Sequence, residues 1–334
     1  MKASQNLVIY SFLFMCVTSI IISGKNVNGL FSFNQTQFDN KSTQIDENFS
    51  KSFLNFGQIY FLKEQKPFFE IDANKLYYEE ETKKITGEIT NGFIYRNGSN
   101  PIKFKSYFAE IFTEIKNINL KNEVEVINQD LKVLSDALSI FENGNEVKAY
   151  NHVKTYRIDS ETKDEIKIFS NEAWFNNTNS VLKYFGNVNG FIKRNKKYEE
   201  SLSFIANEID FNNETHVATF NGNIQLNKGN YKAMANRGEI FLQNYNKKLK
   251  YYGLYDDVKL EENYIDQNDH ALKKRKAFAE KLEGFVAEKK IVLTGLPKVI
   301  QGNDVIKGNK ITIRENIEIV EVEDANTNII IEKN

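Results

Sequence analysis

The stretch Val217-Ala218-Thr219-Phe220-Asn221-Gly222-Asn223-Ile224-Gln225-Leu226 decides the fold. Apolar and polar side chains largely alternate along it, which is typical of a β-strand with one buried face, and a glycine stands at its centre. A second alternating run, Asn207–Phe211, precedes it across the polar turn Asn212–Thr215. The sequence therefore predicts two antiparallel strands, the second of which passes through a glycine.

The same phrase recurs through the C-terminal half of the chain. It returns around Gly186, Gly253 and Gly295, so that the four glycines including Gly222 follow one another at intervals of 36, 31 and 42 residues, with a final echo at Gly308. A recurring unit of two strands and a turn indicates one architecture stacked on itself rather than a domain built around a unique catalytic cleft. The uneven spacing favours a winding antiparallel sheet over a strict solenoid, and hence an elongated all-β fold.

A glycine inside a strand usually marks a bulge, a bend or a close backbone approach. Placed at the same point of successive strands, it predicts a sheet that folds over on itself into an open roll. We expect the side chains that strand parity places on the inner face to form a core and, in part, to line an apolar groove that accepts a ligand. These candidates are Ile209, Phe211, Phe220, Ile224, Leu226, Ile240, Leu242, Leu249 and Tyr251.

The composition favours β-structure and excludes several classes of function. The chain of 334 residues has 26 Phe and 16 Tyr but 3 Pro, and aromatic residues fit a pleated, half-buried surface. Its 44 Lys and Arg nearly cancel its 45 Asp and Glu, so no global charge points to nucleic acid. Cys16 is the single cysteine, which excludes an intramolecular disulfide and a zinc site built on cysteines.

An apolar segment opens the chain. The residues from Ala3 to Gly24 carry no charge, and this length of 22 residues is just sufficient for a helix that crosses a bilayer. A cleaved signal peptide is the competing interpretation, but Ile20-Ile21-Ile22 occupies the place where small residues are expected. We expect an uncleaved, single-pass anchor and an exported remainder. The residues expected to hold it in the membrane are Leu7, Phe12, Phe14, Ile20 and Ile22.

Four regions follow from the changes in composition along the chain. They are a membrane anchor at 1–25, a polar spacer at 26–55, a first β region at 56–165 and a second β region at 166–334. Within the second region the charged insert Asp266–Lys276 is expected to form a surface loop, or a short helix running into Ala277–Lys281. The chain is thus predicted to be an all-β protein behind one transmembrane helix.

The C-terminal half of the chain resembles the OstA-like or LptA-type periplasmic domains of lipopolysaccharide export. The likeness rests on the strand-Gly-Asn phrase and, most specifically, on Leu293-Thr294-Gly295-Leu296-Pro297-Lys298-Val299, followed by Gln301-Gly302-Asn303-Asp304 and Ile306-Lys307-Gly308. The region 56–165, a set of β segments such as Leu120–Val126 behind a single anchor, resembles LptC.

The resemblance implies a non-enzymatic mechanism without a cofactor. Domains of this type are similar to a β-jelly roll open at one side, whose apolar interior shields lipid acyl chains. The partners it implies are lipopolysaccharide or a related glycolipid, an inner-membrane ABC transporter that supplies the energy, and other β-jelly-roll export proteins or further copies of this chain joined through edge strands. The implied location is the inner membrane, with one membrane pass and the bulk of the chain in the periplasm.

The residues themselves give no support to catalysis or to a metal site. None of the three histidines, His152, His216 and His270, stands beside a plausible nucleophile, and Asp266–His270 lacks the glycine and the terminal glutamate of a calcium loop. We therefore predict no catalytic residue and no metal ligand. The alternative function is that of a membrane-anchored or secreted β-repeat protein, structural or adhesive, that binds protein or glycan. Large inward side chains favour the lipid conduit over such a packed stalk.

Overall fold

The computed structural model describes residues 31–32 and 51–325, apart from gaps at 64–65, 97–98, 114–116, 129–130, 142–145, 160–161, 177–178, 180, 197–199, 213, 243–248, 267–269 and 315–318. These residues divide into two compact units. The N-terminal unit contains the chain up to Arg157 and the segment Asn171–Ser180, whereas the C-terminal unit contains Ile158–Ser170 and the chain from Val181 onwards. Within the described residues both units are built of β-strands, joined in one place by a 3-10 turn, η2 (Val286–Glu288).

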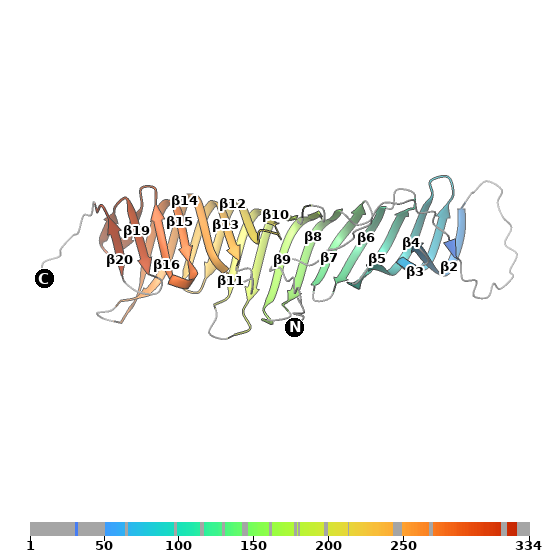
Figure 1. The fold of residues 1–334 in the computed structure, drawn as a ribbon, viewed down its shortest axis with the longest axis horizontal. Coiled ribbons are helices and arrows are strands. Elements are labelled where there is room, and N and C mark those ends of the chain that lie inside the picture. The colour runs from blue at the N-terminus through green and yellow to red at the C-terminus, as the bar shows by residue number, and fades with distance from the viewer. Residues whose placement is uncertain are drawn as a thin grey trace, which may run out of the picture. The chain divides into compact units, whose positions relative to one another are not determined.

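In the N-terminal unit each strand pairs antiparallel with the next one along the chain (Figure 1). Its strands are β1 (Phe31–Ser32), β2 (Lys51–Lys63), β3 (Lys66–Glu79), β4 (Lys84–Arg96), β5 (Ser99–Phe112), β6 (Asn117–Asn128), β7 (Leu131–Phe141) and β8 (Glu146–Ile158). Their inward side chains form an apolar core in which the rings of Phe69 and Phe104 stack 5.6 Å apart. Because β2 begins at Lys51, strand structure starts before residue 55, where the polar spacer was expected to end.

The C-terminal unit continues the same antiparallel order. Strand β9 (Glu165–Asn176) contributes its first half to this unit and pairs with β10. The next strands, each paired with its successor, are β10 (Val181–Lys193), β11 (Leu202–Asn212), β12 (Val217–Lys228), β13 (Tyr231–Leu242), β14 (Leu249–Ile265) and β15 (Leu272–Phe285). The last five are β16 (Lys290–Thr294), β17 (Lys298–Gln301), β18 (Asp304–Lys307), β19 (Lys310–Arg314) and β20 (Val320–Glu323).

Alternate long strands of this unit are interrupted near their middle by a bend. In β10, β12 and β14 one extra residue shifts the register, and two successive residues there take the left-handed conformation: Gly186-Asn187, Gly222-Asn223 and Asp256-Asp257. The predicted bends at Gly186 and Gly222 are therefore confirmed. The prediction for Gly253 is wrong, because this glycine pairs regularly with its neighbours and the bend of β14 lies at Asp256. Aspartate and asparagine tolerate the left-handed conformation better than most residues, so the bend does not require a glycine there.

The last bend breaks a strand in two. Strands β16 and β17 both pair with β15, on either side of Gly295 and Leu296, whose φ angles are 75° and 54°. This confirms the predicted pivot at Gly295. A Cβ atom at Gly295 would lie 2.5 Å from the Cβ atom of Glu280, so the close approach of β15 requires a glycine. Gly308 lies in the short break between β18 and β19.

The bends divide the C-terminal unit into two limbs. We call limb A the strand halves Val181–Phe185, Glu208–Asn212, Val217–Asn221, Arg237–Leu242, Leu249–Tyr255 and Lys281–Phe285, together with β16, β19 and β20. Limb B comprises Val188–Lys193, Leu202–Ile205, Ile224–Lys228, Tyr231–Met234, Val258–Ile265 and Leu272–Ala279, together with β17 and β18.

The second half of the charged insert, from Leu272, is strand and not helix, whereas Asp266, His270 and Ala271 lie outside the strands. Residues Leu272–Phe285 form β15, which pairs with β14 from Ile265 opposite Leu272 to Tyr251 opposite Phe285. The many lysines of this segment favour a helix by local propensity, but Arg275 and the alanines that follow it alternate inward. Pairing along the whole length of β14 outweighs the local preference.

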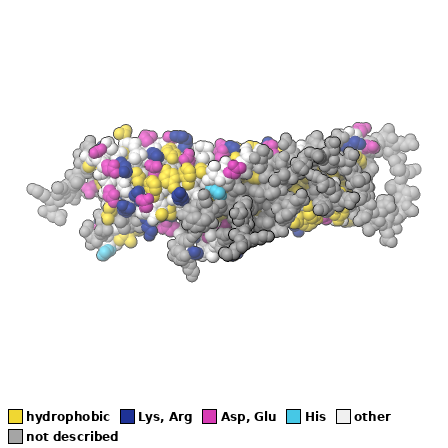
Figure 2. Space-filling view, viewed as in Figure 1, with side chains coloured by type: hydrophobic (Ala, Val, Ile, Leu, Met, Phe, Trp, Pro, Cys, Tyr) yellow, Lys and Arg dark blue, Asp and Glu magenta, His cyan; other side chains and the backbone are white. Residues whose placement is uncertain are grey.

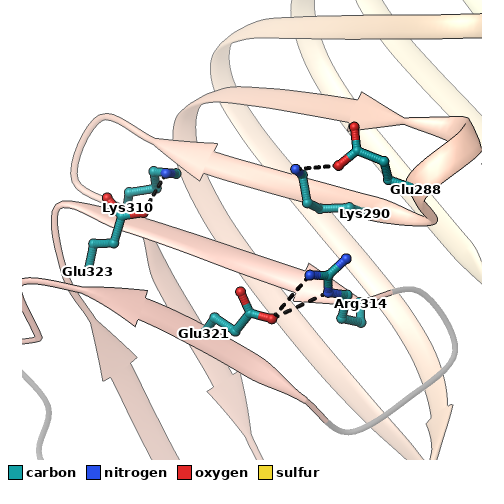
Figure 3. A network of polar contacts seen from close by, with 6 residues as sticks. All are labelled: Glu288, Lys290, Lys310, Arg314, Glu321 and Glu323. Carbon is teal, nitrogen blue, oxygen red and sulfur yellow. Dashed lines mark hydrogen bonds and ion pairs between the residues drawn. The ribbon is translucent and has the colours of Figure 1, made fainter.

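The outer face at the C-terminal end carries ion pairs, two of them between the neighbouring strands β19 and β20, as Figure 3 shows. Lys310 contacts Glu323 at 2.5 Å, Arg314 contacts Glu321 at 3.3 Å and Lys290 contacts Glu288 at 2.6 Å. Exposed pairs of this kind contribute little to stability, about 0–1 kcal/mol each. Their charges do keep the short last strand polar on its solvent side, which opposes unspecific pairing at a sheet edge.

The predicted all-β, antiparallel architecture is confirmed by these strands and their pairing. The predicted membrane helix at 1–25 lies outside the described residues. In the part of the chain that the structure describes, no helix has the length and apolar character needed to span a bilayer.

Candidate functional site

The register of the strands assigns the inner face of each limb. Residues directly opposite one another on neighbouring strands point to the same side of the sheet. In limb A the row beside the bend contains Tyr184, Ile209, Phe220, Gly238, Leu254, Leu282, Leu293 and Ile311, and the next row contains Leu182, Phe211, Ala218, Ile240, Tyr252, Gly284, Ile291 and Ile313. All sixteen residues are buried, so this face of limb A is the interior of the roll.

Limb B has a corresponding pair of rows, and they differ in chemistry. The row nearer the bend is apolar and contains Gly190, Phe204, Leu226, Ala233, Leu260, Ala277 and Val299. The row at the rim contains Ile192, Leu202, Lys228, Tyr231, Glu262, Arg275 and Gln301. The rim is thus apolar in β10 and β11 and polar from β12 onwards.

An apolar cavity lies between the limbs on the side of β9 to β13. It is lined by Ile166, Ile168, Ile192, Arg194, Leu202, Phe204, Ala218, Phe220, Ile240, Leu242 and Leu249. Limb A contributes the side chains of β12, β13 and the start of β14, and the others come from β9 to β11. Only about 20 Å³ is open to the centre of a water-sized sphere, which is little more than one water molecule needs. The limbs must therefore part before a larger apolar ligand can enter.

Phe204 is the aromatic wall of this cavity, and a glycine positions it. A Cβ atom at the opposed Gly190 would lie 1.9 Å from Cζ of Phe204, so the ring lies flat on the glycine backbone. The rings of Phe204 and Phe220, the latter from the other limb, pack edge to face at a centroid distance of 5.5 Å and an angle of 83°. Such an edge-to-face pair contributes about 0.5–1.5 kcal/mol beyond the area that it buries. The two rings join the limbs at this point.

Arg194 supplies a cation at the cavity. Its Nη1 donates to Oδ2 of Asp164 at 2.8 Å, and the N–H of Asn195 donates to the other carboxylate oxygen at 2.9 Å. Burial alone would raise the pKa of Asp164, but the hydrogen bonds from Asn195 and Arg194 outweigh it and the pKa is lowered. Asp164 thus stays ionised and holds the guanidinium at the edge of an otherwise apolar wall.

The predicted groove residues separate into three groups. Phe220, Ile240, Leu242 and Leu249 line the cavity. Ile209, Phe211, Ile224 and Leu226 are buried in the roll away from this lining. Tyr251 is a correction. It lies opposite Phe241 and Phe285, on the outer face, because an irregularity after Phe241 places Leu249 opposite Leu242 and reverses the parity that the sequence suggested.

On that outer face Tyr251 belongs to an aromatic row. Its ring lies 5.3 Å from that of Phe241 and 5.4 Å from that of Phe285, and its hydroxyl donates to Oε1 of Glu283 at 2.8 Å. Burial and then the bond to Glu283 raise the pKa of Tyr251. Figure 2 shows hydrophobic side chains at the surface of this unit with charged ones around them.

Sequence reasoning missed seven lining residues: Ile166, Ile168, Ile192, Arg194, Leu202, Phe204 and Ala218. The alternation Glu165-Ile166-Lys167-Ile168 was a usable signal for a strand with one buried face. Nothing local in the sequence indicates that the lining residues of β9 to β11 face the limb A halves of β12 and β13. The expected anchor residues Leu7, Phe12, Phe14, Ile20 and Ile22 lie outside the described residues.

The described residues place no cluster of three His, Cys, Asp or Glu side chains where a metal ion could be held. The two neighbouring carboxylates at the bend of β14 have different partners. Asp256 accepts from Arg237 Nε at 2.5 Å, whereas Asp257 accepts from Lys259 at 2.8 Å.

Comparison with known proteins finds a family that matches one segment of the C-terminal unit. Residues 205–318 match the family described as "LptA/(LptD N-terminal domain) LPS transport protein". This segment is an LptA-like domain. It contains the limb A residues of the cavity from Ala218 to Leu249, whereas Phe204 and the lining residues before it precede the match. The match stops short of the N-terminal unit, so the resemblance of residues 56–165 to LptC stays a prediction.

The chain is also similar to a solved structure, that of LptH, described as the LptA homologous periplasmic component of the lipopolysaccharide transport device from Pseudomonas aeruginosa. The two are 18% identical, the likeness covers 40% of this chain and 95% of that one, and the TM-score is 0.34. At that score the likeness supports no further conclusion. No curated protein matches the chain.

Proposed function

We propose that the C-terminal unit shields the acyl chains of lipopolysaccharide, or of a related glycolipid, while the lipid is exported through the periplasm, without catalysis and without a cofactor. The observation that carries this proposal is the apolar cavity between the two limbs of a roll that includes the LptA-like domain. Each methylene removed from water contributes about 0.8 kcal/mol, so an acyl chain gains several kcal/mol by entering such an interior.

The chemistry of the lining supports a lipid with a polar, anionic head. Ten of the eleven lining side chains are apolar and the eleventh is Arg194. The guanidinium that Asp164 holds at the wall supplies a cation of the kind that pairs with a phosphate or carboxylate, while the hydrocarbon lies on Phe204, Phe220 and Leu242. Because the cavity is almost closed without a ligand, binding must part the limbs.

A photocrosslinking experiment tests this function. We would place p-benzoylphenylalanine at Leu242 inside the cavity and, as a matched control, at the adjacent Phe241, which lies on the outer face. In cells that make lipopolysaccharide, an adduct with the lipid is expected from position 242 and not from position 241. Equal lipid adducts at both positions, or none at 242 beside strong protein adducts, would overturn the proposal.

We further propose that residues 1–25 anchor the chain in the inner membrane as a single pass, and that the roll bridges an ABC transporter in that membrane to downstream β-roll proteins. The uncharged segment from Ala3 to Gly24 supports the anchor. Alkaline extraction of membranes tests it, because an anchored chain stays in the pellet. Release of the chain into the supernatant, with a mature N-terminus after residue 24, would show that the segment is cleaved.

A structural role is the second candidate, and one observation favours it for part of the unit. Beneath β14 to β19 the inward residues Leu260, Val299, Leu293 and Ile311 are almost completely buried, and none of them lines the cavity. A protein used only as a stalk would be filled throughout. Protein adducts alone from position 242 would support this alternative.

A further inference from the structure

A polar row closes the rim of limb B toward the C-terminal end. Tyr231, Glu262, Arg275 and Gln301 stand directly opposite one another on β13, β14, β15 and β17, at the level that Ile192 and Leu202 occupy in β10 and β11. Because their parity is inward, these polar side chains face the interior of the roll. An apolar rim lies beside the cavity, and a polar rim lies beyond it.

Two contacts from this row cross to limb A. The hydroxyl of Tyr252, on limb A, donates to the hydroxyl of Tyr231 at 3.0 Å. Nη2 of Arg275 reaches the backbone carbonyl of Arg314, at the end of β19, at 3.5 Å. A glycine makes the first contact possible, because the ring of Tyr252 lies on Gly284, where a Cβ atom would approach it to 2.0 Å. The two limbs are therefore joined at their rims by polar groups.

The charges in the row are fully buried. Arg275 and Glu262 have side-chain exposures of 0% and 1%, and Nη2 of Arg275 donates to Oε2 of Glu262 at 2.6 Å. The guanidinium also lies 5.1 Å from the ring centroid of Tyr264. A buried ion pair is often no more stabilising than apolar residues of similar volume, whereas loss of one partner leaves an uncompensated charge. Such a pair suits a closure that favours one arrangement of the limbs.

We propose that Tyr231, Tyr252, Glu262, Arg275 and Gln301 form a polar clasp that holds the limbs together from β13 to β19. The clasp confines an acyl chain to the cavity between β9 and β13, and the lipid advances toward the C-terminal end only when the clasp opens. The confinement of lipid rests on the proposed function, but the joining of the limbs does not. The filled rows beneath the clasp, with Leu260 and Val299 buried, agree with a closed state.

The first test measures the distance between the two limbs in the absence of lipid. The full chain, with Cys16→Ser, would carry spin labels at the exposed positions Asn263 on limb B and Lys289 beside limb A, and their separation would be measured by pulsed electron resonance. One narrow distance is expected for the parent. Tyr231→Phe with Tyr252→Phe removes only two hydroxyls, and Arg275→Gln removes the cation that contacts Glu262.

Both variants are expected to add a longer distance, whereas Tyr255→Phe on the outer face, the matched control, should not. An unchanged narrow distance in the double tyrosine variant and in folded Arg275→Gln would overturn the clasp. If Arg275→Gln fails to fold, the tyrosine variant decides alone.

The second test follows lipid. A photocrosslinker at Leu202 reports the cavity, and one at Leu260 reports the row beneath the clasp. In the parent we expect lipid adducts at 202 and at least tenfold fewer at 260. Replacing the pair by Glu262→Met and Arg275→Met should raise the adducts at 260 toward those at 202. Equal adducts in the parent would overturn the confinement. Absence of lipid at both positions in every variant would refute the proposed function, and the spin-label distances would still judge the clasp.

Discussion

Replacing Gly190 by alanine tests how the wall of the cavity is built. The new Cβ atom would lie 1.9 Å from the ring of Phe204, and ordinary contact begins at 3.4 Å, so the ring must withdraw by about 1.5 Å. The cavity in front of the ring has room for about 20 Å³, far less than a phenyl group. Overpacking of this kind costs about 1–3 kcal/mol. The lower chain entropy of alanine in the unfolded state returns about 0.5–1 kcal/mol, so we expect a net loss of about 1–2 kcal/mol.

Hydrogen exchange followed by mass spectrometry is the suitable assay, because it reports β10 to β12 separately from the N-terminal unit. The expected loss corresponds to exchange about 5- to 30-fold faster in those strands. Adding Phe204→Leu should recover part of the loss, since the shorter side chain leaves the glycine site free. Additivity of the two substitutions within about 0.5 kcal/mol would contradict a steric conflict between Gly190→Ala and Phe204, because residues in such conflict must couple.

Three further outcomes are expected. In a urea titration, Gly222→Ala should lower the free energy of unfolding by about 1–2 kcal/mol because the bend of β12 is strained, whereas Asn223→Gly should be neutral or slightly stabilising. Asp164 has a lowered pKa, so its contribution is present above the ordinary aspartate pKa and is lost as the pH falls below about 4; Asp164→Asn should flatten this acid dependence of exchange in β9 and β10. The hydrogen bond to Glu70, together with burial, raises the pKa of Tyr95 to about 12, so the N-terminal unit should lose stability as the pH rises from about 10 to 12, and Tyr95→Phe should reduce that loss.

The fold was largely predictable because its information is local. Alternation and polar turns define the strands, and a glycine followed by asparagine marks two bends correctly, at Gly186 and Gly222. The third bend escaped prediction because Asp256 and Asp257 adopt the left-handed conformation without glycine. Strand β15 escaped because its lysine-rich sequence favours a helix, and only the pairing with β14 reveals the strand.

The candidate site was less predictable because it depends on how the limbs face each other. Parity places Phe220, Ile240 and Leu242 on the inner face, and that part of the prediction holds. It fails at Tyr251, where an irregular residue between Leu249 and Tyr251 reverses the face. The cavity also joins Phe204 to side chains of the opposite limb, and no spacing along the chain encodes that juxtaposition.

Stability alone does not explain why charged side chains occupy inward positions in the polar rim. Glu262 and Arg275 occupy inward positions that a packed roll would fill with apolar side chains, as β10 and β11 do with Ile192 and Leu202. Departures from the local rule tend to mark function, because an arrangement that stability does not require must be retained for another reason. Both charges are buried together and both rims are linked by hydrogen bonds, so the departure creates a closed end beside an apolar cavity. If the proposed function is correct, a roll with this division would hold a hydrocarbon chain in one half, once the limbs part there, while the other half stays closed.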